Sequence, residues 1–268
     1  LYGVALSRLK GMTGYLAQQL IEKAGSGENL FRMKEPDLYR LTGIKGEVFS
    51  EATRRAALEE ARREMDFAER QHVRVLFYTD EAYPLRLREC PDAPAVLYYR
   101  GEASLNPVRA VSIVGTRHAT PYGKSFCETF IRELKEIFPD VLVVSGLAYG
   151  IDISAHRSAL RNGLCTVGVL AHGLNMLYPD VHRHTAAEME RQGGLLTEYP
   201  SSNVLHRGNF IARNRIVAGI SDATLVVESA EKGGALITAD LAGSYNRDVF
   251  ALPGRINDVY SKGCNRLI

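Results

Sequence analysis

Glycine-rich turns that carry cationic or aromatic side chains recur at three places along the chain, at 115–117, 145–150 and 232–234. Each turn stands where an apolar stretch gives way to a helix, so glycine lets the backbone approach a ligand and the helix N-terminus offers N–H groups to an anion. The planar guanidinium of Arg117 suits a phosphodiester. The site residues expected from these turns are Gly115, Thr116, Arg117, Ser145, Gly146, Tyr149, Gly150, Lys232, Gly233 and Gly234.

A second source of binding chemistry is the segment 205–215, which contains Phe210 and the arginines Arg207, Arg213 and Arg215. No acidic residue falls between Tyr199 and Ser221, so these arginines read as uncompensated. If this segment and the Arg117 turn face one sheet edge, they form a basic groove. A base can stack on the Phe210 ring while guanidinium groups hold the backbone, a combination that favours single strands over duplex. The alternative is that Phe210 anchors its loop in the core.

Asp152 and His156 stand one helical turn apart, directly after the second glycine-rich turn. That spacing is compatible with acid–base chemistry. The structural alternative has Asp152 capping its own helix and His156 packing or hydrogen-bonding locally. We favour the structural alternative, and we expect no enzyme activity.

Familiar cofactor and metal motifs do not occur. The 115–123 turn has no Gly-x-Gly-x-x-Gly, and no acidic residue follows the second strand to hold a ribose, so we expect no nicotinamide or flavin cofactor. The 4 cysteines lie far apart without a Cys-x-x-Cys pair, and the histidines have no metal-like spacing beyond His182-x-His184, so we expect reduced thiols and no metal.

The elements that must position these turns alternate between strand and helix after residue 107. This alternation predicts an α/β fold with an extended Rossmann-like, doubly wound and mostly parallel sheet, whose ligands bind beyond the carboxyl ends of the strands. The predicted strands are 73–77, 95–99, 110–114, 141–144, 165–170, 195–196, 223–227 and 249–252. The predicted helices between them are 124–138, 151–162, 185–192, 211–220 and 236–245.

Residues 1–70 read instead as a small helical domain, with helices at 16–21, 38–41 and 50–71, so we expect two domains, 1–70 and 71–268. The pattern Leu-x-Gly-apolar-x-Gly occurs at 9–14 and 41–46, which is typical of a helix-hairpin-helix turn or of a plain packing unit. With 46% apolar residues, no leader and no apolar run near the ~20 residues that span a membrane, we expect a globular cytoplasmic protein without membrane contact. The net charge of +2 alone points to no nucleic acid.

Taken in order along the chain, these motifs resemble the DNA-processing protein A (DprA/Smf) family. The matching stretches are 115–117, 145–152 with 155–156, 178–179, Phe210 with 213–222, 234–239, 250–254 and 263–268. The helical start is similar to that family's SAM-like or helix-hairpin-helix module. Three places depart from the family: Tyr149 replaces a basic residue, Gly233 and Ala235 replace serines, and Ile211 replaces a proline.

The resemblance implies a homodimer that binds and protects single-stranded DNA and loads the RecA recombinase during natural transformation. It assigns phosphate contacts to Arg117 and Arg207 and base stacking to Phe210, and it implies no winged-helix domain within these residues, although many relatives carry one. One alternative is a nucleotide hydrolase of the lysine-decarboxylase-like phosphoribohydrolase type, whose Pro-Gly-Gly-x-Gly-Thr motif is incomplete at 232–238. Another is a recombinase assembly factor with incidental DNA affinity.

Overall fold

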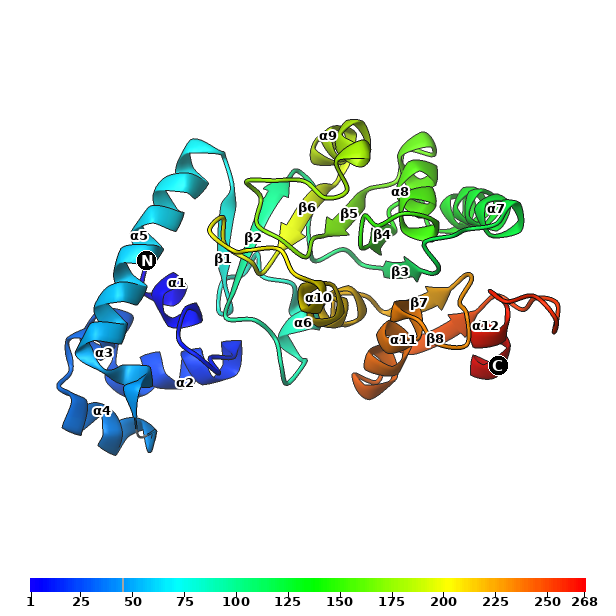
Figure 1. The fold of residues 1–268 in the computed structure, drawn as a ribbon. Coiled ribbons are helices and arrows are strands. Elements are labelled where there is room, and N and C mark those ends of the chain that lie inside the picture. Colours follow the sequence, from blue (N-terminus) through cyan, green and yellow to red (C-terminus); the bar gives the residue numbers. More distant parts are fainter. Residues whose placement is uncertain (45) are drawn as a thin grey trace.

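The chain folds into one mixed β-sheet with helices on both faces and a cluster of helices at one edge (Figure 1). The computed structural model describes residues 1–44 and 46–268. Within these residues the sheet has 8 strands in the order β1-β2-β6-β5-β4-β3-β7-β8. The strands are β1 (Arg74–Phe77), β2 (Val96–Gly101), β3 (Ala110–Val114), β4 (Leu142–Ser145), β5 (Thr166–Val169), β6 (Gly194–Thr197), β7 (Ala223–Val226) and β8 (Asp248–Ala251).

The six strands from β6 to β8 run parallel, and the edge pair β1 and β2 runs antiparallel. The inner strands β4, β5 and β6 are buried at every position, as expected for parallel strands covered on both faces. The predicted fold class, an extended Rossmann-like and mostly parallel sheet, is confirmed.

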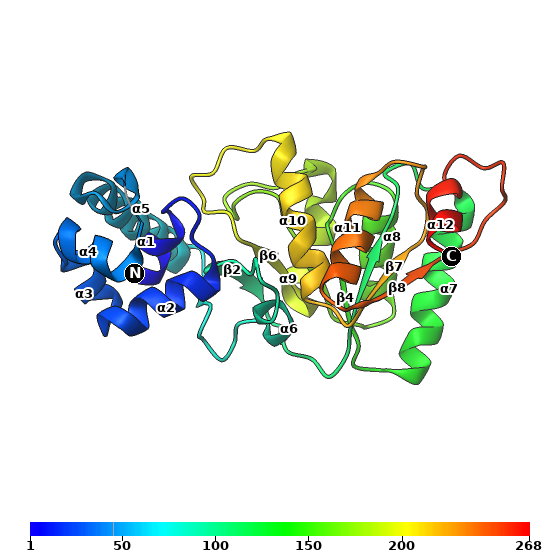
Figure 2. The same ribbon diagram turned by 90° about the horizontal axis from the view of Figure 1, so that it is seen from below.

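Helices from successive crossovers cover the two faces separately. The helices α7 (Pro121–Ile137), α8 (Ile151–Arg161) and α9 (Arg183–Gln192) lie on one face, and α10 (Arg207–Gly219) and α11 (Gly234–Ser244) lie on the other (Figures 1 and 2). The chain moves outward from β3 through β4, β5 and β6, then returns to place β7 on the other side of β3. This reversal leaves a crevice at the carboxyl ends of β3 and β7, where ligands of such sheets bind.

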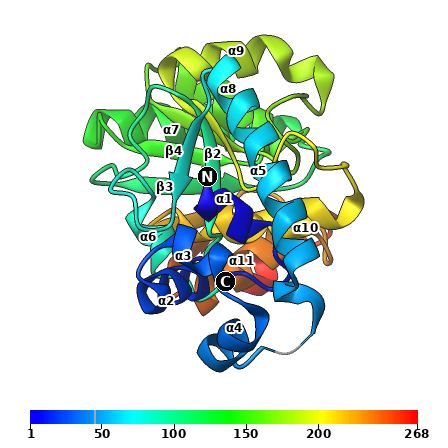
Figure 3. The ribbon, with the colours of Figure 1, turned by 90° about the vertical axis from the view of Figure 1, so that its left-hand side faces the viewer.

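The N-terminal helices stand at the β1 edge of the sheet (Figure 1), and they face the viewer in Figure 3. They are α1 (Tyr2–Ser7), α2 (Gly14–Ala24), α3 (Gly27–Arg32), α4 (Glu35–Thr42), the 3₁₀ turn η1 (Glu47–Phe49) and α5 (Glu51–Arg70). Their buried side chains share one apolar core with residues of β2, β6, α8 and α9. The buried carboxylate of Glu64 on α5 accepts hydrogen bonds from the backbone N–H and the hydroxyl of Ser201, which ties α5 to the loop after β6.

The sequence missed α1 and α3, and the helices α2 and α4 are longer than predicted because Thr13 caps α2 and a proline opens α4. The second repeat, 41–46, includes residue 45, which lies outside the described residues. The division at residues 70 and 71 stays a prediction.

Helix α10 starts at Arg207, whereas the sequence predicted a helix from residue 211. The reason is an N-cap at His206, whose ring Nδ1 accepts a hydrogen bond of 3.1 Å from the Gly208 N–H. Arg207 and Phe210 therefore lie on the first turn of a helix and not in a loop. The remaining short elements are α6 (Leu85–Arg88), η2 (Asp180–His182) and α12 (Lys262–Leu267).

Among the described residues, no helix combines the length and apolar character that a membrane crossing requires. All 4 cysteines are free, and only Cys165 is exposed.

Candidate functional site

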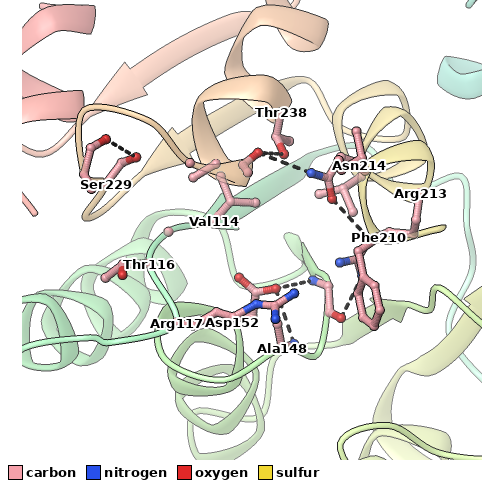
Figure 4. Close-up of a pocket in the computed structure, with 18 of the residues that line it drawn as sticks. Val114, Thr116, Arg117, Ala148, Asp152, Phe210, Arg213, Asn214, Ser229 and Thr238 are labelled. Atoms are coloured by element: carbon pink, nitrogen blue, oxygen red, sulfur yellow. Dashed lines mark hydrogen bonds between the residues drawn. The ribbon is translucent and has the colours of Figure 1, made fainter. Parts of the chain in front are cut away.

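A groove of about 750 Å³ opens at the carboxyl ends of β3, β4 and β7 (Figure 4). Its walls are the turns that follow these strands and the first turns of α10 and α11. Sequence-predicted residues that line it are Gly115, Thr116, Arg117, Gly146, Arg207, Phe210, Arg213, Lys232, Gly233 and Gly234. The structure thus joins three separated turns and the 205–215 segment in one site. Ser145, Tyr149, Gly150 and Arg215 do not line it.

Two glycines bring the turns after β3 and β4 into backbone contact. Gly150 has a φ of +79°, and a Cβ there would lie 2.1 Å from the carbonyl oxygen of Thr116. A Cβ on Gly115 would lie 2.5 Å from Cγ1 of Ile151, and Thr116 donates its N–H to the carbonyl oxygen of Glu228 at 2.7 Å. The turns after β3, β4 and β7 are therefore fixed against one another, so Arg117 is presented from a rigid base.

Phe210 and Arg117 form the aromatic and cationic centre of the groove. The guanidinium carbon of Arg117 lies 5.3 Å from the centroid of the Phe210 ring. The ring of Tyr178 contacts Phe210 edge to face, with centroids 5.7 Å apart and planes at 67°. Arg117 itself is exposed and Phe210 is half-buried. A planar cation beside an aromatic ring offers one surface for a phosphate and one for a base.

The opposite wall carries a second place for an anion. Gly233 is the N-cap of the 11-residue helix α11, so the N–H groups of its first turn and the positive end of its dipole face the groove beside Lys232. The nearest atoms to a Cβ at Gly233 and Gly234 would be Ser229 Oγ at 3.3 Å and Asn214 Nδ2 at 3.7 Å. This wall is therefore open to a ligand, and Lys232 and Arg207 are both exposed.

The charge of Arg213 is compensated in the structure, so the interpretation from the sequence is wrong for this residue. Its side chain is buried, and Nη1 donates to the carbonyl oxygens of Gly146, at 2.7 Å, and of Val169. The nearby carboxylate of Asp152 stabilises the charge, while burial lowers the pKa of Arg213 from its ordinary value. A Cβ on Gly146 would lie 2.4 Å from the guanidinium, so this glycine makes room for it. Arg213 braces the floor of the groove.

Arg215 is also compensated, and it points out of the groove. Its guanidinium forms an ion pair with Glu198 and donates to the carbonyl oxygen of Asp92 at 2.7 Å. Burial raises the pKa of Glu198, and the charge of Arg215 opposes that rise. Successive arginines at 213 and 215 point to different sides of α10 because residues two apart on a helix do not share a face.

Asp152 and His156 do not bond to each other. Asp152 Oδ2 accepts hydrogen bonds from the N–H groups of Gly146, at 3.1 Å, and Ala148, at 3.4 Å, so it closes the preceding turn. The prediction that it caps its own helix is wrong, since both N–H groups that it accepts from precede α8, which begins at Ile151. His156 Nδ1 bonds Thr166 Oγ1 at 2.7 Å, the local role that was predicted.

Burial shifts the pKa of both Asp152 and His156, in opposite directions. It raises the pKa of Asp152 and lowers the pKa of His156 to about 3, with Arg213 and His182 adding to the second effect. His156 is therefore neutral near pH 7. Among the described residues, no three His, Cys, Asp or Glu side chains gather as a metal site.

The remaining predicted residues lie beside the groove. Ser145 is buried and its hydroxyl donates to the carbonyl oxygen of Ile113 at 2.6 Å, which fastens β4 to β3. Tyr149 is 45% exposed, and its ring contacts that of His182 with centroids 5.2 Å apart. Together with Gly150, Tyr149 lines an adjoining hollow.

Sequence reasoning missed several lining residues. The rings of His118 and Tyr260 both line the groove and stack on each other, with centroids 6.2 Å apart and planes at 23°. Nothing in the sequence brings Tyr260 to His118, because the two residues are far apart along the chain. For Asn214 the sequence gives only a weak signal, its position directly after Arg213. In the structure its amide donates to the carbonyl oxygen of Gly234 at 3.2 Å, which joins α10 to α11.

Comparison with known proteins places this chain in a family. The chain is 35% identical to protein Smf of Synechocystis over all of its own length and 68% of that protein. It is 34% identical to the DNA processing protein DprA of Streptococcus pneumoniae, over 96% of this chain and 89% of that protein.

Solved structures agree with the sequence comparison. The S. pneumoniae DprA structure matches with a TM-score of 0.79 at 32% identity, over 99% of this chain and 90% of that one. A DprA structure from Helicobacter pylori, which concerns that protein's single-stranded-DNA binding mode, matches with a TM-score of 0.65 at 33% identity, over 73% of this chain and 86% of that one. Residues 74–268 also match the family model of DNA recombination-mediator protein A. The chain therefore belongs to the DNA recombination-mediator protein A family, the family of the DprA and Smf proteins.

Proposed function

We propose that the groove binds single-stranded DNA without catalysing a reaction on it. The observation that carries the proposal is the guanidinium of Arg117 beside the Phe210 ring, at 5.3 Å, in a groove that also exposes Arg207 and Lys232. The H. pylori relative, whose structure concerns single-stranded-DNA binding, supports it.

The proposed contacts divide into two kinds. Arg117, Arg207 and Lys232 neutralise phosphates, and the N-terminus of α11, with Gly233 and Gly234, receives a further phosphate through its N–H groups. Phe210 stacks on a base, which requires an unpaired base and therefore favours a single strand over duplex. Arg213 and Ser145 contribute indirectly, because they hold the strand-end turns in place through their hydrogen bonds. Arg215 lies outside the groove, paired with Glu198.

The arrangement gives little support to a hydrolase. Asp152 is occupied by two backbone N–H groups, and His156 is held by Thr166. Neither side chain is placed as a general acid or base for a group in the groove. Release of free base from AMP by the purified protein would contradict this part of the proposal.

The proposal extends to the biological role. A homodimer in the cytoplasm protects incoming single strands during natural transformation and loads the RecA recombinase onto them. If loading depends on DNA held in the groove, Arg117→Ala should impair both DNA binding and recombinase filament assembly. A variant that loses DNA binding yet assembles recombinase normally would favour the assembly-factor alternative instead.

The decisive test is a salt series of binding to oligothymidine, measured by fluorescence anisotropy. Each lost phosphate contact should reduce the slope of log affinity against log salt by about 0.7 for a single strand. We expect this reduction for Arg117→Ala and for Arg207→Ala, and no change for Arg62→Ala, an exposed arginine on α5 that lies outside the groove. If both groove variants bind as the parent does, the proposed site is wrong.

A further inference from the structure

We propose that the bound strand leaves the groove over the outer face of α8 and continues into the cleft between α8 and α9. This inference rests on the proposed function, because it extends the path of the same strand. It adds Lys124, Arg157, Arg161 and Arg191 as phosphate contacts.

Two further hollows continue the groove, one after the other. A second hollow, of about 490 Å³, shares Arg117 and His118 with the groove and lies over α7 and α8. A cleft of about 690 Å³ between α8 and α9 shares Arg157 and Arg161 with the second hollow. A ligand that leaves the groove at Arg117 therefore meets a continuous depression as far as α9.

The floor of the second hollow is one face of α8. Its lining residues on that helix are Ile153, Ser154, Arg157, Ser158 and Arg161, which follow the spacing of a single helical face. Helix α8 has 11 residues and rises about 16 Å. At the roughly 3.4 Å between phosphates along one strand of a duplex, that length matches on the order of five phosphates.

The path carries more positive than negative charge. Lys124, Arg157, Arg161 and Arg191 are all exposed along it, against the carboxylates Glu128 and Glu188. The ion pair of Arg161 with Glu128 is 3.6 Å long, and both side chains are more than half exposed, at 57% and 58%. So exposed a pair is weak, and Arg161 can exchange it for a phosphate at little cost.

Arg157 is already oriented for this role. Its Nε donates to Thr185 Oγ1 at 3.2 Å, across the cleft from α8 to α9, so the side chain is held at the junction of the two hollows. A guanidinium held in this way loses less conformational entropy on binding than a free one.

Tyr149 supplies an aromatic surface where the second hollow begins. It lines this hollow with Arg117 and Arg157, and its contact with His182 fixes the ring while the residue stays 45% exposed. The combination of an exposed ring and neighbouring guanidinium groups repeats the chemistry of Phe210 and Arg117. An occupant with alternating bases and phosphates satisfies both elements of this path.

The test compares two oligothymidines under a salt series, one of about 4 nucleotides that the groove alone can hold and one of about 12 nucleotides, within the usual site sizes of single-strand binders. For Arg157→Gln with Arg161→Gln, we expect the log-log salt slope to fall by about 1.4 on the longer strand, since each lost contact removes about 0.7. Binding of the shorter strand should stay at the parent's value, which also shows that the variant is folded. The control is Arg55→Gln with Arg62→Gln, two exposed arginines on α5, which should alter neither strand.

An unchanged slope on the longer strand would overturn the extended path. Equal losses on both strands would overturn it as well, since the two arginines would then act through the groove itself. A different result would contradict the proposed function, namely that Arg117→Ala binds the shorter strand as tightly as the parent does. The two ideas are therefore judged by different oligonucleotides.

Discussion

Replacing Arg213 by methionine should destabilise the fold far more than replacing its neighbour Arg207. Methionine keeps the apolar stem of Arg213 but removes the donor that the carbonyl oxygens of Gly146 and Val169 share. It also leaves the buried carboxylate of Asp152 without the positive charge beside it.

The magnitude follows from these losses. An unsatisfied buried acceptor costs about 1–3 kcal/mol, and the substitution leaves two such carbonyl oxygens without this donor. The buried carboxylate of Asp152 also loses a nearby positive charge, which adds to the cost. We therefore expect Arg213→Met to lower the free energy of unfolding by about 3–5 kcal/mol at neutral pH, a large share of the ~5–15 kcal/mol available to a typical domain.

The loss should depend on pH in a defined direction. Burial already raises the pKa of Asp152 in the folded state, and Arg213 opposes that rise, so the substitution raises the pKa further. A carboxyl with a raised folded pKa favours folding when protonated and opposes it when ionised. The deficit of Arg213→Met should therefore be largest near neutral pH and shrink as the pH falls through the folded pKa.

Urea unfolding of the parent, Arg213→Met, Asp152→Asn and the double variant measures these effects. Adding Asp152→Asn should recover part of the loss, with a coupling of about 0.5–3 kcal/mol. The matched control is Arg207→Met, exposed on the first turn of the same helix, which should change stability by no more than about 0.5 kcal/mol and instead weaken DNA binding. A deficit for Arg213→Met below about 1 kcal/mol, or one independent of Asp152, would refute the reasoning.

Two further outcomes are expected elsewhere. Tyr149→Ala should weaken binding of a longer oligothymidine by about 1–3 kcal/mol through lost stacking, whereas Tyr149→Phe should bind as the parent does; equal losses in the two variants would assign the effect to the hydroxyl. Burial lowers the pKa of His156 from 6.5 to about 3, so its neutral form contributes stability above pH 6.5 that is lost as the pH falls towards the folded value. From this histidine we expect a loss of about 2 kcal/mol between neutral pH and about pH 5, by the linkage of pKa to stability. Urea unfolding across that range should give a shallower pH dependence for His156→Gln than for the parent, and parallel curves would contradict the assignment.

Much of the architecture was readable from the chain alone. Apolar stretches separated by turns predicted every strand of the sheet. The inner strands β4, β5 and β6 are continuous apolar runs because they are parallel and buried on both faces, whereas β1 and β2 were predicted from alternating apolar residues. The turns at Gly115, Gly146 and Gly233 were placed correctly at the edge of the sheet where strands end. The helix boundary at Arg207 was not, since the hydrogen bond that the His206 ring accepts from the Gly208 N–H is a local geometry that no sequence pattern indicates.

The roles of the three arginines in the 205–215 segment were decided only by the tertiary structure. The sequence determined that Arg207, Arg213 and Arg215 carry positive charge in a stretch without acids, and that Phe210 stands among them. The fold then exposed Arg207 at the groove, turned Arg213 onto the carbonyl oxygen of Gly146, 67 residues away, and paired Arg215 with Glu198, 17 residues away. Charge compensation acts through space and depends on burial, so a count along the chain cannot assign it.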